Sequence, residues 1–468
     1  MGRSSSNAHV SPYRAAAVAI CIALVAPREA RANGRFPASS AVVFSPASDD
    51  DVLVRVTFGL LVTRDRGKSW RWICERAIGF SGPEDPTYVL TKSGAIVAGL
   101  FDGLRVTRDG GCTWEAVKTD AKVFVDLTMR DDGSTIALAS SYDRHSDAGS
   151  LYKSQLYVST DDARTFAPLG ARIDPTLLAE SVEVAASDPK RLYVSAVRGD
   201  DVGRRGVLLV SNDAGAHWIE RPIAAEDQLA PFIAAVDAKR ADRVYIRTAA
   251  SPEKPTLLLV TDDAGKTYRR LLGAKGPLLG FALSPDGKTV YAGGPDDGLF
   301  GGASDAKELS PLSKLRVQCL GQHKDTLWAC SSEAGGFVAG TASAAAALAL
   351  TGEPAADAAA PFDARLHLGD IGGPLTCAAG SAVAKECGID WKKLSNDLGI
   401  GDNDKSDADA AAPAAGGRAG QTADAARVDA AAKAKESSVS RDRTAWYAAI
   451  AAAIVVAIFV VKGRRKGT

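Results

Sequence analysis

Short apolar runs separated by polar, glycine-rich turns recur along most of the chain. Five of these runs end directly before the same kind of polar turn, and they cover residues 52–62, 96–106, 154–158, 206–210 and 256–260. Short runs rich in β-branched residues and bounded by turn residues are typical of β-strands. The 45 glycines of the chain fit this interpretation, because a fold with many short strands needs many tight turns. The pattern therefore predicts an all-β region.

The polar turn after each run has the form Ser/Thr-x-Asp-x-Gly-x-Thr/Ser-aromatic. Five copies begin 44 to 52 residues apart, which is close to the length of a four-stranded propeller blade. Alanine replaces the glycine in the third copy, and histidine replaces the second hydroxyl residue in the fourth. The recurring positions are Asp65, Gly67, Trp70, Asp109, Gly111, Trp114, Asp161, Phe166, Asp213, Gly215, Trp218, Asp263, Gly265 and Tyr268.

Each residue type of the repeat has a structural explanation. Glycine allows a tight turn, and aspartate accepts hydrogen bonds from backbone N–H groups and so holds the loop closed. The aromatic residue begins the next strand and packs inward. We therefore interpret the repeat as the hairpin loop between two strands of one blade, and not as a catalytic motif.

The repeat resembles the Asp-box, or BNR repeat, of sialidases, sortilin-type receptor ectodomains and photosystem assembly-factor propellers. The resemblance covers residues 42–350 and implies a β-propeller, but no particular activity. The chain is also similar to secreted bacterial propeller proteins that have a comparable Asn-Gly-Arg-Phe-Pro segment, here residues 33–37.

Decayed copies of the repeat set the expected number of blades. Residues 303–307 stand where a sixth copy belongs, and residues 341–348 correspond to an eroded seventh. We therefore expect a β-propeller of four-stranded blades over residues 36–375, with seven blades favoured and six as the alternative. The last blade ends near Leu350 or is completed by residues 365–368. A disulfide-tied helical cap is expected over residues 376–400, with its helix at 382–398.

The cysteines and the N-terminus indicate export. Residues 1–32 read as a signal peptide, with a basic start, an apolar stretch and the small-x-small sequence Ala30-Arg31-Ala32. Of the seven cysteines, six remain after its removal, an even number that favours disulfides in an oxidising compartment. Proximity in the sequence favours three pairs: Cys74 with Cys112, Cys319 with Cys330, and Cys377 with Cys387.

The C-terminal region predicts a membrane tether. Residues 401–443 form a linker rich in Ala, Asp and Gly, whose composition is typical of disorder. Residues 444–462 form a short transmembrane helix, and residues 463–468 form a basic cytoplasmic tail. These features predict a single-pass membrane protein with a periplasmic or cell-surface propeller.

Charge and motifs exclude several classes of function. The 56 basic residues balance 56 acidic ones, which argues against a nucleic-acid partner. The sequence contains no Gly-x-Ser-x-Gly elbow, phosphate-binding loop, His-Glu-x-x-His motif or sialidase Phe-Arg-Ile-Pro signature. No catalytic residue, cofactor or metal site is predicted.

Two loops are longer than a propeller needs, and long loops on a rigid scaffold often carry function. They cover residues 140–153 and 198–205, and the alternative is that both are merely solvated. The candidate ligand-contact residues on them are Tyr142, Arg144, His145, Arg204 and Arg205. Glu84, Asp85 and Asp102 lie near expected blade starts, where they either face the centre or form turns.

These observations favour an exported, membrane-tethered module that binds a protein, peptide or glycan and is not an enzyme. The two alternatives are a sialidase-like glycoside hydrolase and an assembly factor for a membrane complex.

Overall fold

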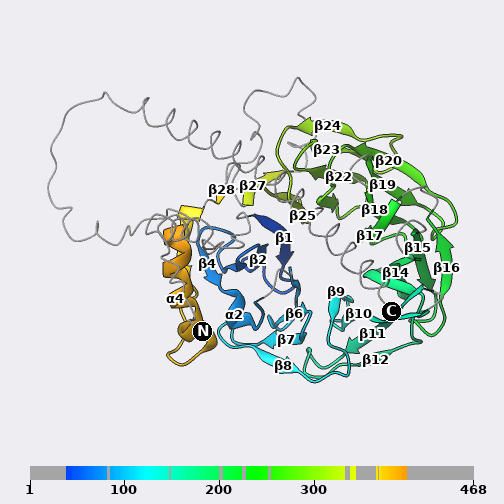
Figure 1. Ribbon diagram of the computed structural model, residues 1–468. Helices are drawn as coiled ribbons and strands as arrows, with labels where there is room; N and C mark the ends of the chain where they lie inside the picture. The colour runs from blue at the N-terminus through cyan, green and yellow to red at the C-terminus, as the bar shows by residue number, and fades with distance from the viewer. Residues whose placement is uncertain are drawn as a thin grey trace, which may run out of the picture. The chain divides into compact units, whose positions relative to one another are not determined.

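Seven sheets form a ring in the computed structural model of the chain (Figure 1). The structure describes residues 38–81, 85–146, 149–199, 204–223, 228–250, 254–331, 338–343, 365–366 and 368–397. Within these residues, six sheets consist of four antiparallel strands, and one sheet has four antiparallel strands and a parallel fifth. The chain is therefore an all-β propeller of four-stranded blades.

Four consecutive strands build each blade. The first three blades contain β1 (Ser39–Phe44), β2 (Val52–Val56), β3 (Gly59–Thr63), β4 (Trp70–Ile73); β5 (Thr87–Leu90), β6 (Ile96–Leu100), β7 (Gly103–Thr107), β8 (Glu115–Val117); and β9 (Phe124–Met129), β10 (Thr135–Ser146), β11 (Gly149–Ser159), β12 (Ala167–Leu169). The next two contain β13 (Leu177–Ala185), β14 (Asp188–Arg198), β15 (Arg205–Ser211), β16 (Ile219–Pro222); and β17 (Gln228–Val236), β18 (Val244–Ala250), β19 (Thr256–Thr261), β20 (Arg269–Ala274). The last two contain β21 (Gly280–Leu283), β22 (Thr289–Gly294), β23 (Gly298–Ala303), β24 (Ser310–Ser313); and β25 (Cys319–His323), β26 (Thr326–Cys330), β27 (Val338–Ser343), β28 (Arg365–Leu366).

The first strand of every blade contacts the first strand of the next, so these seven strands surround the ring centre. The ring closes where β1 packs against β25. The middle strands are the most apolar; every residue of β3 and of β6 is buried. The fourth strands lie at the outer edge, and β8 and β12 are largely exposed. This gradient explains why the sequence shows one strong apolar run before each polar loop.

The repeated loop joins the third and fourth strands of a blade, and the same hydrogen bonds recur in all five copies. In the third copy, Ser159 Oγ donates to Asp161 Oδ1 at 2.8 Å and accepts from the Ala163 N–H at 2.9 Å. The Thr165 N–H donates to Asp161 Oδ1 at 2.9 Å, and the Thr165 hydroxyl donates to Oδ2 at 2.6 Å. Gly215 in the fourth copy has φ +90°, but Ala163 adopts φ +57° without being glycine. The residues of the repeat are therefore structural.

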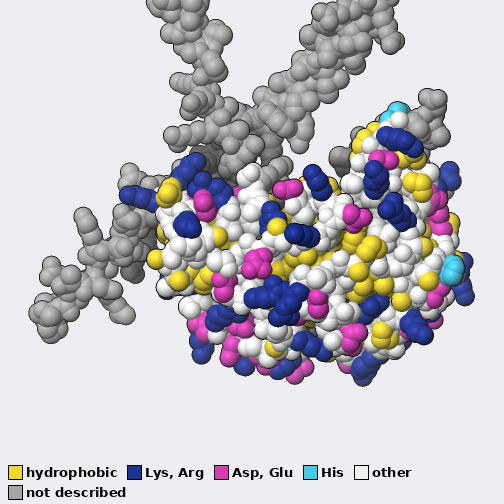
Figure 2. Space-filling model, turned by 90° about the horizontal axis from the view of Figure 1, so that it is seen from below, with side chains coloured by type: hydrophobic (Ala, Val, Ile, Leu, Met, Phe, Trp, Pro, Cys, Tyr) yellow, Lys and Arg dark blue, Asp and Glu magenta, His cyan; other side chains and the backbone are white. Residues whose placement is uncertain are grey.

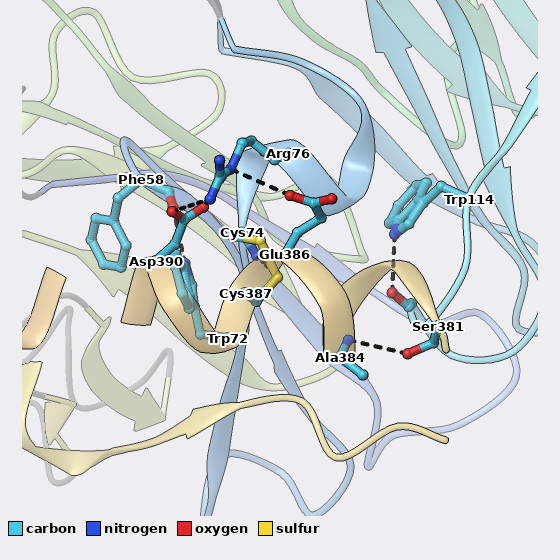
Figure 3. The surroundings of a disulfide bond; sticks show 11 residues. Phe58, Trp72, Cys74, Arg76, Trp114, Ser381, Ala384, Glu386, Cys387 and Asp390 are labelled. Carbon is cyan, nitrogen blue, oxygen red and sulfur yellow. Dashed lines mark hydrogen bonds and ion pairs between the residues drawn. A yellow bond between two sulfur atoms is a disulfide. The ribbon is translucent and has the colours of Figure 1, made fainter. Parts of the chain in front are cut away.

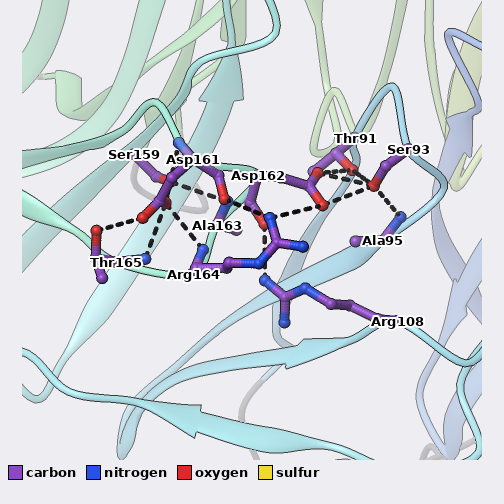
Figure 4. A network of polar contacts seen from close by, with 10 residues as sticks. All are labelled: Thr91, Ser93, Ala95, Arg108, Ser159, Asp161, Asp162, Ala163, Arg164 and Thr165. Atoms are coloured by element: carbon purple, nitrogen blue, oxygen red, sulfur yellow. Dashed lines mark hydrogen bonds and ion pairs between the residues drawn. The ribbon is translucent and has the colours of Figure 1, made fainter.

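The repeated loops also connect neighbouring blades (Figure 4). Asp162, next to Asp161, accepts hydrogen bonds from Thr91 Oγ1 at 2.7 Å and from Ser93 Oγ at 2.8 Å, both in the β5–β6 turn of the preceding blade. Arg108 donates to the Asp162 carbonyl oxygen at 2.7 Å. The loops thus fix the angle between blades as well as the hairpins themselves.

Replacement of Asp161 by alanine is expected to lower the free energy of unfolding by about 1 kcal/mol, because a half-exposed set of hydrogen bonds is lost. Hydrogen bonds from Thr165 and neighbouring groups lower the pKa of Asp161 to about 2. Its contribution is therefore present above pH 4 and lost as the pH falls towards 2. Urea unfolding at pH 7 and pH 2.5 measures both effects. Asp305→Ala, in the decayed sixth copy, is the control, and an equal loss in both variants at pH 7 contradicts the prediction.

Two of the three predicted disulfide pairings differ from those in the structure. Cys74 is bonded to Cys387 and Cys112 to Cys377, across sequence separations of 313 and 265 residues. The predicted pairs of Cys74 with Cys112 and of Cys377 with Cys387 are therefore wrong. Ring closure brings the C-terminal segment beside the first two blades, so proximity in space does not follow proximity in sequence. Only the pairing of Cys319 with Cys330 is confirmed.

The C-terminal segment clamps the outer edge of the first blade (Figure 3). After η3 (Leu368–Asp370), β29 (Ile371–Pro374) pairs in parallel with β4, and α4 (Ala382–Asp397) packs against α2 (Glu75–Ile78). Trp391 of α4 lies against Trp72 with ring centroids 5.5 Å apart, and Arg76 Nε donates to Asp390 Oδ2 at 2.9 Å. The parallel strand covers an edge that would otherwise be open to pairing with another chain.

Several predictions concern residues outside the described ranges. These are the signal peptide at 1–32, the segment at 33–37, Glu84, the linker at 401–443, the transmembrane helix at 444–462 and the tail at 463–468. Within the described ranges, no helix has the length and apolar character that a membrane span requires.

Candidate functional site

Two carboxyl groups lie on the first strands of the third and fourth blades, which contact each other. Asp126 lies on β9, and its two oxygens accept hydrogen bonds from the Leu127 N–H at 2.9 Å and the Val182 N–H at 2.8 Å. Glu183 lies on the neighbouring β13 and accepts a hydrogen bond from Thr128 Oγ1 at 2.9 Å. Both side chains are partly buried at the ring centre.

Both groups have altered acidity. Desolvation raises the pKa of Asp126 to about 6, although its backbone hydrogen bonds oppose this. Desolvation and the charge of Asp126 raise the pKa of Glu183 to about 8. At neutral pH the pair therefore holds one ionised carboxylate and one protonated carboxylic acid. General acid–base catalysis requires such a pair, in which one group can donate a proton and the other can accept one.

One arginine, Arg55, lies close to this pair, and a second, Arg247, lies close to Arg55. Arg55 of β2 donates from Nε to Ser40 Oγ at 2.8 Å, and its charge opposes the upward shift in the pKa of Asp126. Arg247 of β18 donates from Nη1 to the carbonyl oxygens of Leu278 and Leu279 at 2.8 and 2.7 Å. Its Nε is buried and has no hydrogen-bond partner within the described part of the chain. Desolvation and the nearby charge of Arg55 lower the pKa of Arg247 to about 10.

Arg55 and Arg247 occupy equivalent positions in the second strands of their blades. Arg55 pairs with Leu60, three residues before the loop threonine Thr63, and Arg247 pairs with Leu258, three residues before Thr261. The equivalent residues in blades two, three and four are Gly99, Leu138 and Ser195. Arginine therefore occupies this position in the first and fifth blades and a small or apolar residue in the others compared.

These four residues were not predicted from the sequence. The signal that would have identified them is a charge inside a mostly apolar strand: Arg55 in Val52–Val56, Asp126 in Phe124–Met129, Arg247 in Val244–Ala250, and Glu183, together with Glu180, in Leu177–Ala185. A charge is costly in such a strand unless it is paired or faces a site.

A third carboxyl group, that of Glu180, lies on the same strand as Glu183. Desolvation raises the pKa of Glu180 on β13 to about 7, and the charge of Arg204 opposes the shift. Arg204 is exposed in the connection between β14 and β15, of which residues 200–203 lie outside the described ranges. Of the predicted ligand-contact residues, Arg204 is thus the one whose charge acts on the carboxyl group of Glu180. Arg205 is exposed at the start of β15.

The other predicted contact residues lie on a ribbon formed by the extended ends of β10 and β11. Tyr142, Arg144 and His145 are all exposed. Tyr142, 59% exposed, contacts Tyr152 edge-on, with ring centroids 6.3 Å apart. The base of the ribbon is fixed, because the Tyr152 N–H donates to the Pro175 carbonyl oxygen at 2.7 Å.

Both long loops therefore rise from the same two blades whose first strands carry the carboxyl pair. They lie on the face opposite the repeated loops. In an antiparallel blade, the turn between the second and third strands is at one end of the strands, and the turn between the third and fourth strands is at the other end. Asp85 and Asp102 are exposed in connections on this face. The carbonyl oxygens of Asp85 and Pro86 accept hydrogen bonds from Arg55, which makes this segment a support for the arginine.

The face of the body shown in Figure 2 carries charges of both signs. Figure 2 shows Lys and Arg side chains interspersed with Asp, Glu and hydrophobic side chains over one side of the body. Nor do the described residues contain a group of three or more His, Cys, Asp and Glu arranged to hold a metal ion. The ring centre is therefore the most chemically distinctive part of the described chain.

No family model matches the chain, and no curated relative matches it. Among solved structures, it is similar to an ancestral GH74 enzyme, with 13% identity over 63% of this chain and a TM-score of 0.48. A Hadza microbial sialidase shares 15% identity over 63% of this chain and 73% of its own, with a TM-score of 0.39. The extracellular domain of a putative one component system from B. thetaiotaomicron shares 14% identity over 64% of this chain and 37% of its own, with a TM-score of 0.44.

The chain spans only 44% of the length of the ancestral GH74 enzyme. One prediction is nevertheless corrected. We expected a protein that is not an enzyme, because recognised catalytic motifs are missing. The similar solved structures include three GH74 enzymes and a sialidase, and the expectation of a protein without catalytic activity is therefore withdrawn.

Proposed function

We propose that this protein is an exported glycoside hydrolase that acts on glycans bearing a carboxylate group. The observation that carries the proposal is the set of Asp126, Glu183, Arg55 and Arg247 at the ring centre. A pair of carboxyl groups whose environments separate their pKa values is the basic equipment for glycosidic-bond cleavage.

In the proposed reaction Glu183 is the acid and Asp126 is the base. Glu183, with its pKa raised to about 8, keeps a proton that it donates to the leaving-group oxygen as the glycosidic C–O bond breaks. Asp126, with its pKa near 6, is ionised and accepts a proton from the water that attacks the anomeric carbon. Thr128 holds the Glu183 carboxyl in place.

Arg247 supports the carboxylate preference. Its Nε is buried and has no hydrogen-bond partner among the residues that the structure describes, and its charge lies close to that of Arg55. A desolvated guanidinium with a free N–H is stabilised by an anion, and the planar fork of arginine matches a carboxylate. A carboxylate on the sugar would supply the missing partner.

Export is supported by the disulfides. Three disulfides within the described residues indicate an extracellular or periplasmic compartment. The signal peptide at 1–32 and the tether at 444–462 would keep the propeller at the membrane, outside the cytoplasm.

The test is a panel of chromogenic aryl glycosides that compares sialosides and uronides with the corresponding neutral sugars between pH 4 and pH 9. We expect turnover of at least one acidic glycoside, with kcat/KM highest between about pH 6 and pH 8, where Asp126 is ionised and Glu183 protonated. Asp126→Asn is expected to remove turnover, and Glu115→Gln, an exposed carboxyl on β8, is the control. No turnover of any glycoside, or equal turnover in Asp126→Asn, contradicts the proposal.

A further inference from the structure

The ribbon of the third blade extends β10 and β11 beyond the end of β9, on the face opposite the repeated loops. β9 pairs with β10 only as far as Ala139, and the last contact is the Ser140 N–H donating to the Val123 carbonyl oxygen at 3.1 Å. Tyr142 is three residues beyond Ala139, which places it roughly 10 Å past the end of the ring. A ligand that contacts both Tyr142 and the carboxyl pair must therefore be longer than one sugar ring.

Tyr142 is exposed but not loose. It packs edge-on against Tyr152, which is only 9% exposed, and Tyr152 is tied to Pro175 by a backbone hydrogen bond. Lys153 Nζ and Asp143 form an ion pair at 2.7 Å on the same ribbon. An aromatic ring held in place with an open face binds the C–H face of a pyranose ring with little loss of side-chain entropy.

The ribbon also carries positive charge. Arg144 and His145 are exposed beyond Tyr142, and Arg204 and Arg205 are exposed on the adjoining connection of the fourth blade. By contrast, Arg198 in that blade is neutralised by Glu220, with Nη2 and Oε2 2.6 Å apart. Arg144, Arg204 and Arg205 stand on the same two blades as Asp126 and Glu183.

We infer that Tyr142 forms a distal binding subsite, and that the ligand is an extended anionic polysaccharide running from the ribbon to the ring centre. The inference rests on the proposed function and names its substrate as a polymer instead of a single terminal acidic sugar. The aromatic ring contributes stacking, and Arg144 with Arg204 contributes attraction for carboxylates along the chain.

Binding is measured first, without any need for turnover. Affinity electrophoresis in gels containing polygalacturonate, alginate or hyaluronan, with dextran as the neutral polymer, is expected to retard the wild-type propeller with at least one anionic polymer. Tyr142→Ala is expected to weaken that binding at least tenfold, and Tyr142→Phe to retain it. Phe101→Ala is the matched control, because Phe101 is equally exposed, at 59%, on the neighbouring second blade.

The variants separate this inference from the proposed function. If the polymer is hydrolysed, Tyr142→Ala should raise KM for the polymer at least tenfold and leave kcat/KM for a short aryl glycoside within twofold. Polymer binding that depends on Tyr142 but is not followed by hydrolysis contradicts the proposed function and supports the subsite. Wild-type retardation by none of the anionic polymers, or equal retardation of the wild type, Tyr142→Ala and Phe101→Ala, overturns the subsite.

Discussion

Replacement of Glu183 by glutamine is expected to reduce hydrolysis at least a thousandfold and, at the same time, to stabilise the fold at pH 8. The first effect follows because glutamine has no proton to donate to the leaving group. The second follows because a carboxyl group in this position is held away from water. Activity and stability should therefore change in opposite directions.

The size of the stabilisation by Glu183→Gln depends on pH. Burial and the charge of Asp126 raise the pKa of Glu183 from 4.5 to about 8. Below pH 4.5 Glu183 is protonated in both the folded and the unfolded chain, so its ionisation does not change the free energy of unfolding. As the pH rises towards 8, the unfolded chain gains stability by ionising, and the folded state loses stability relative to it. Glutamine removes this loss, which is on the order of 4 kcal/mol at pH 8.

Thermal unfolding of the wild type and Glu183→Gln at pH 4.5 and pH 8 measures the effect. The variant should have the higher Tm at pH 8, and the difference should shrink at pH 4.5. Glu115→Gln provides the matched control, with an unchanged Tm at both values and unchanged activity. A Glu183→Gln protein that is equally active, or less stable at pH 8 than at pH 4.5 relative to the wild type, would rule out a desolvated acid at this position.

The repeated loops could be predicted from the sequence because their structure is local. Thr63 Oγ1, Asp65 and Ser69 form a closed set of hydrogen bonds within seven residues, so the residue types alone specify the loop. The pairing of Cys319 with Cys330 is local in the same sense, because the two residues lie directly opposite each other in the β25–β26 hairpin.

The site could not be predicted in this way, because its parts come from four blades. Asp126 and Glu183 meet only through the contact of β9 with β13, and Arg247 reaches the ring centre from the fifth blade. The long loops are recognisable in the sequence by their length, whereas each residue of the site is a charge within a mostly apolar strand. The two groups of residues are related only by the ring, which places the long loops above the blades that carry the carboxyl pair.

Removal of the two disulfides that hold the C-terminal clamp is expected to cost more stability than removal of the disulfide within the last blade. Cys74–Cys387 and Cys112–Cys377 close loops of 313 and 265 residues, whereas Cys319–Cys330 closes one of 11. In the chain-entropy account, the stabilisation grows with the logarithm of loop length, and the difference between 313 and 11 residues is about 3 kcal/mol.

The two clamp disulfides should not act additively. When one is removed, the other still ties the C-terminal segment to the first two blades, and the remaining disulfide limits the freedom gained by the unfolded chain. A variant with Cys74→Ser and Cys387→Ser should therefore lose little, and the variant with all four cysteines replaced should lose most of the effect. Freed α4 also exposes Trp72, which Trp391 covers.

Chemical unfolding and limited proteolysis test this together. The fourfold serine variant should unfold at lower denaturant concentration than the Cys319→Ser/Cys330→Ser control and be cut between β29 and α4 under conditions in which the control is intact. Because β29 and the Arg76–Asp390 ion pair remain, the ring itself should still fold. Equal unfolding midpoints and equal resistance to protease in the two variants would show that β29 and α4 hold the first blade without covalent help.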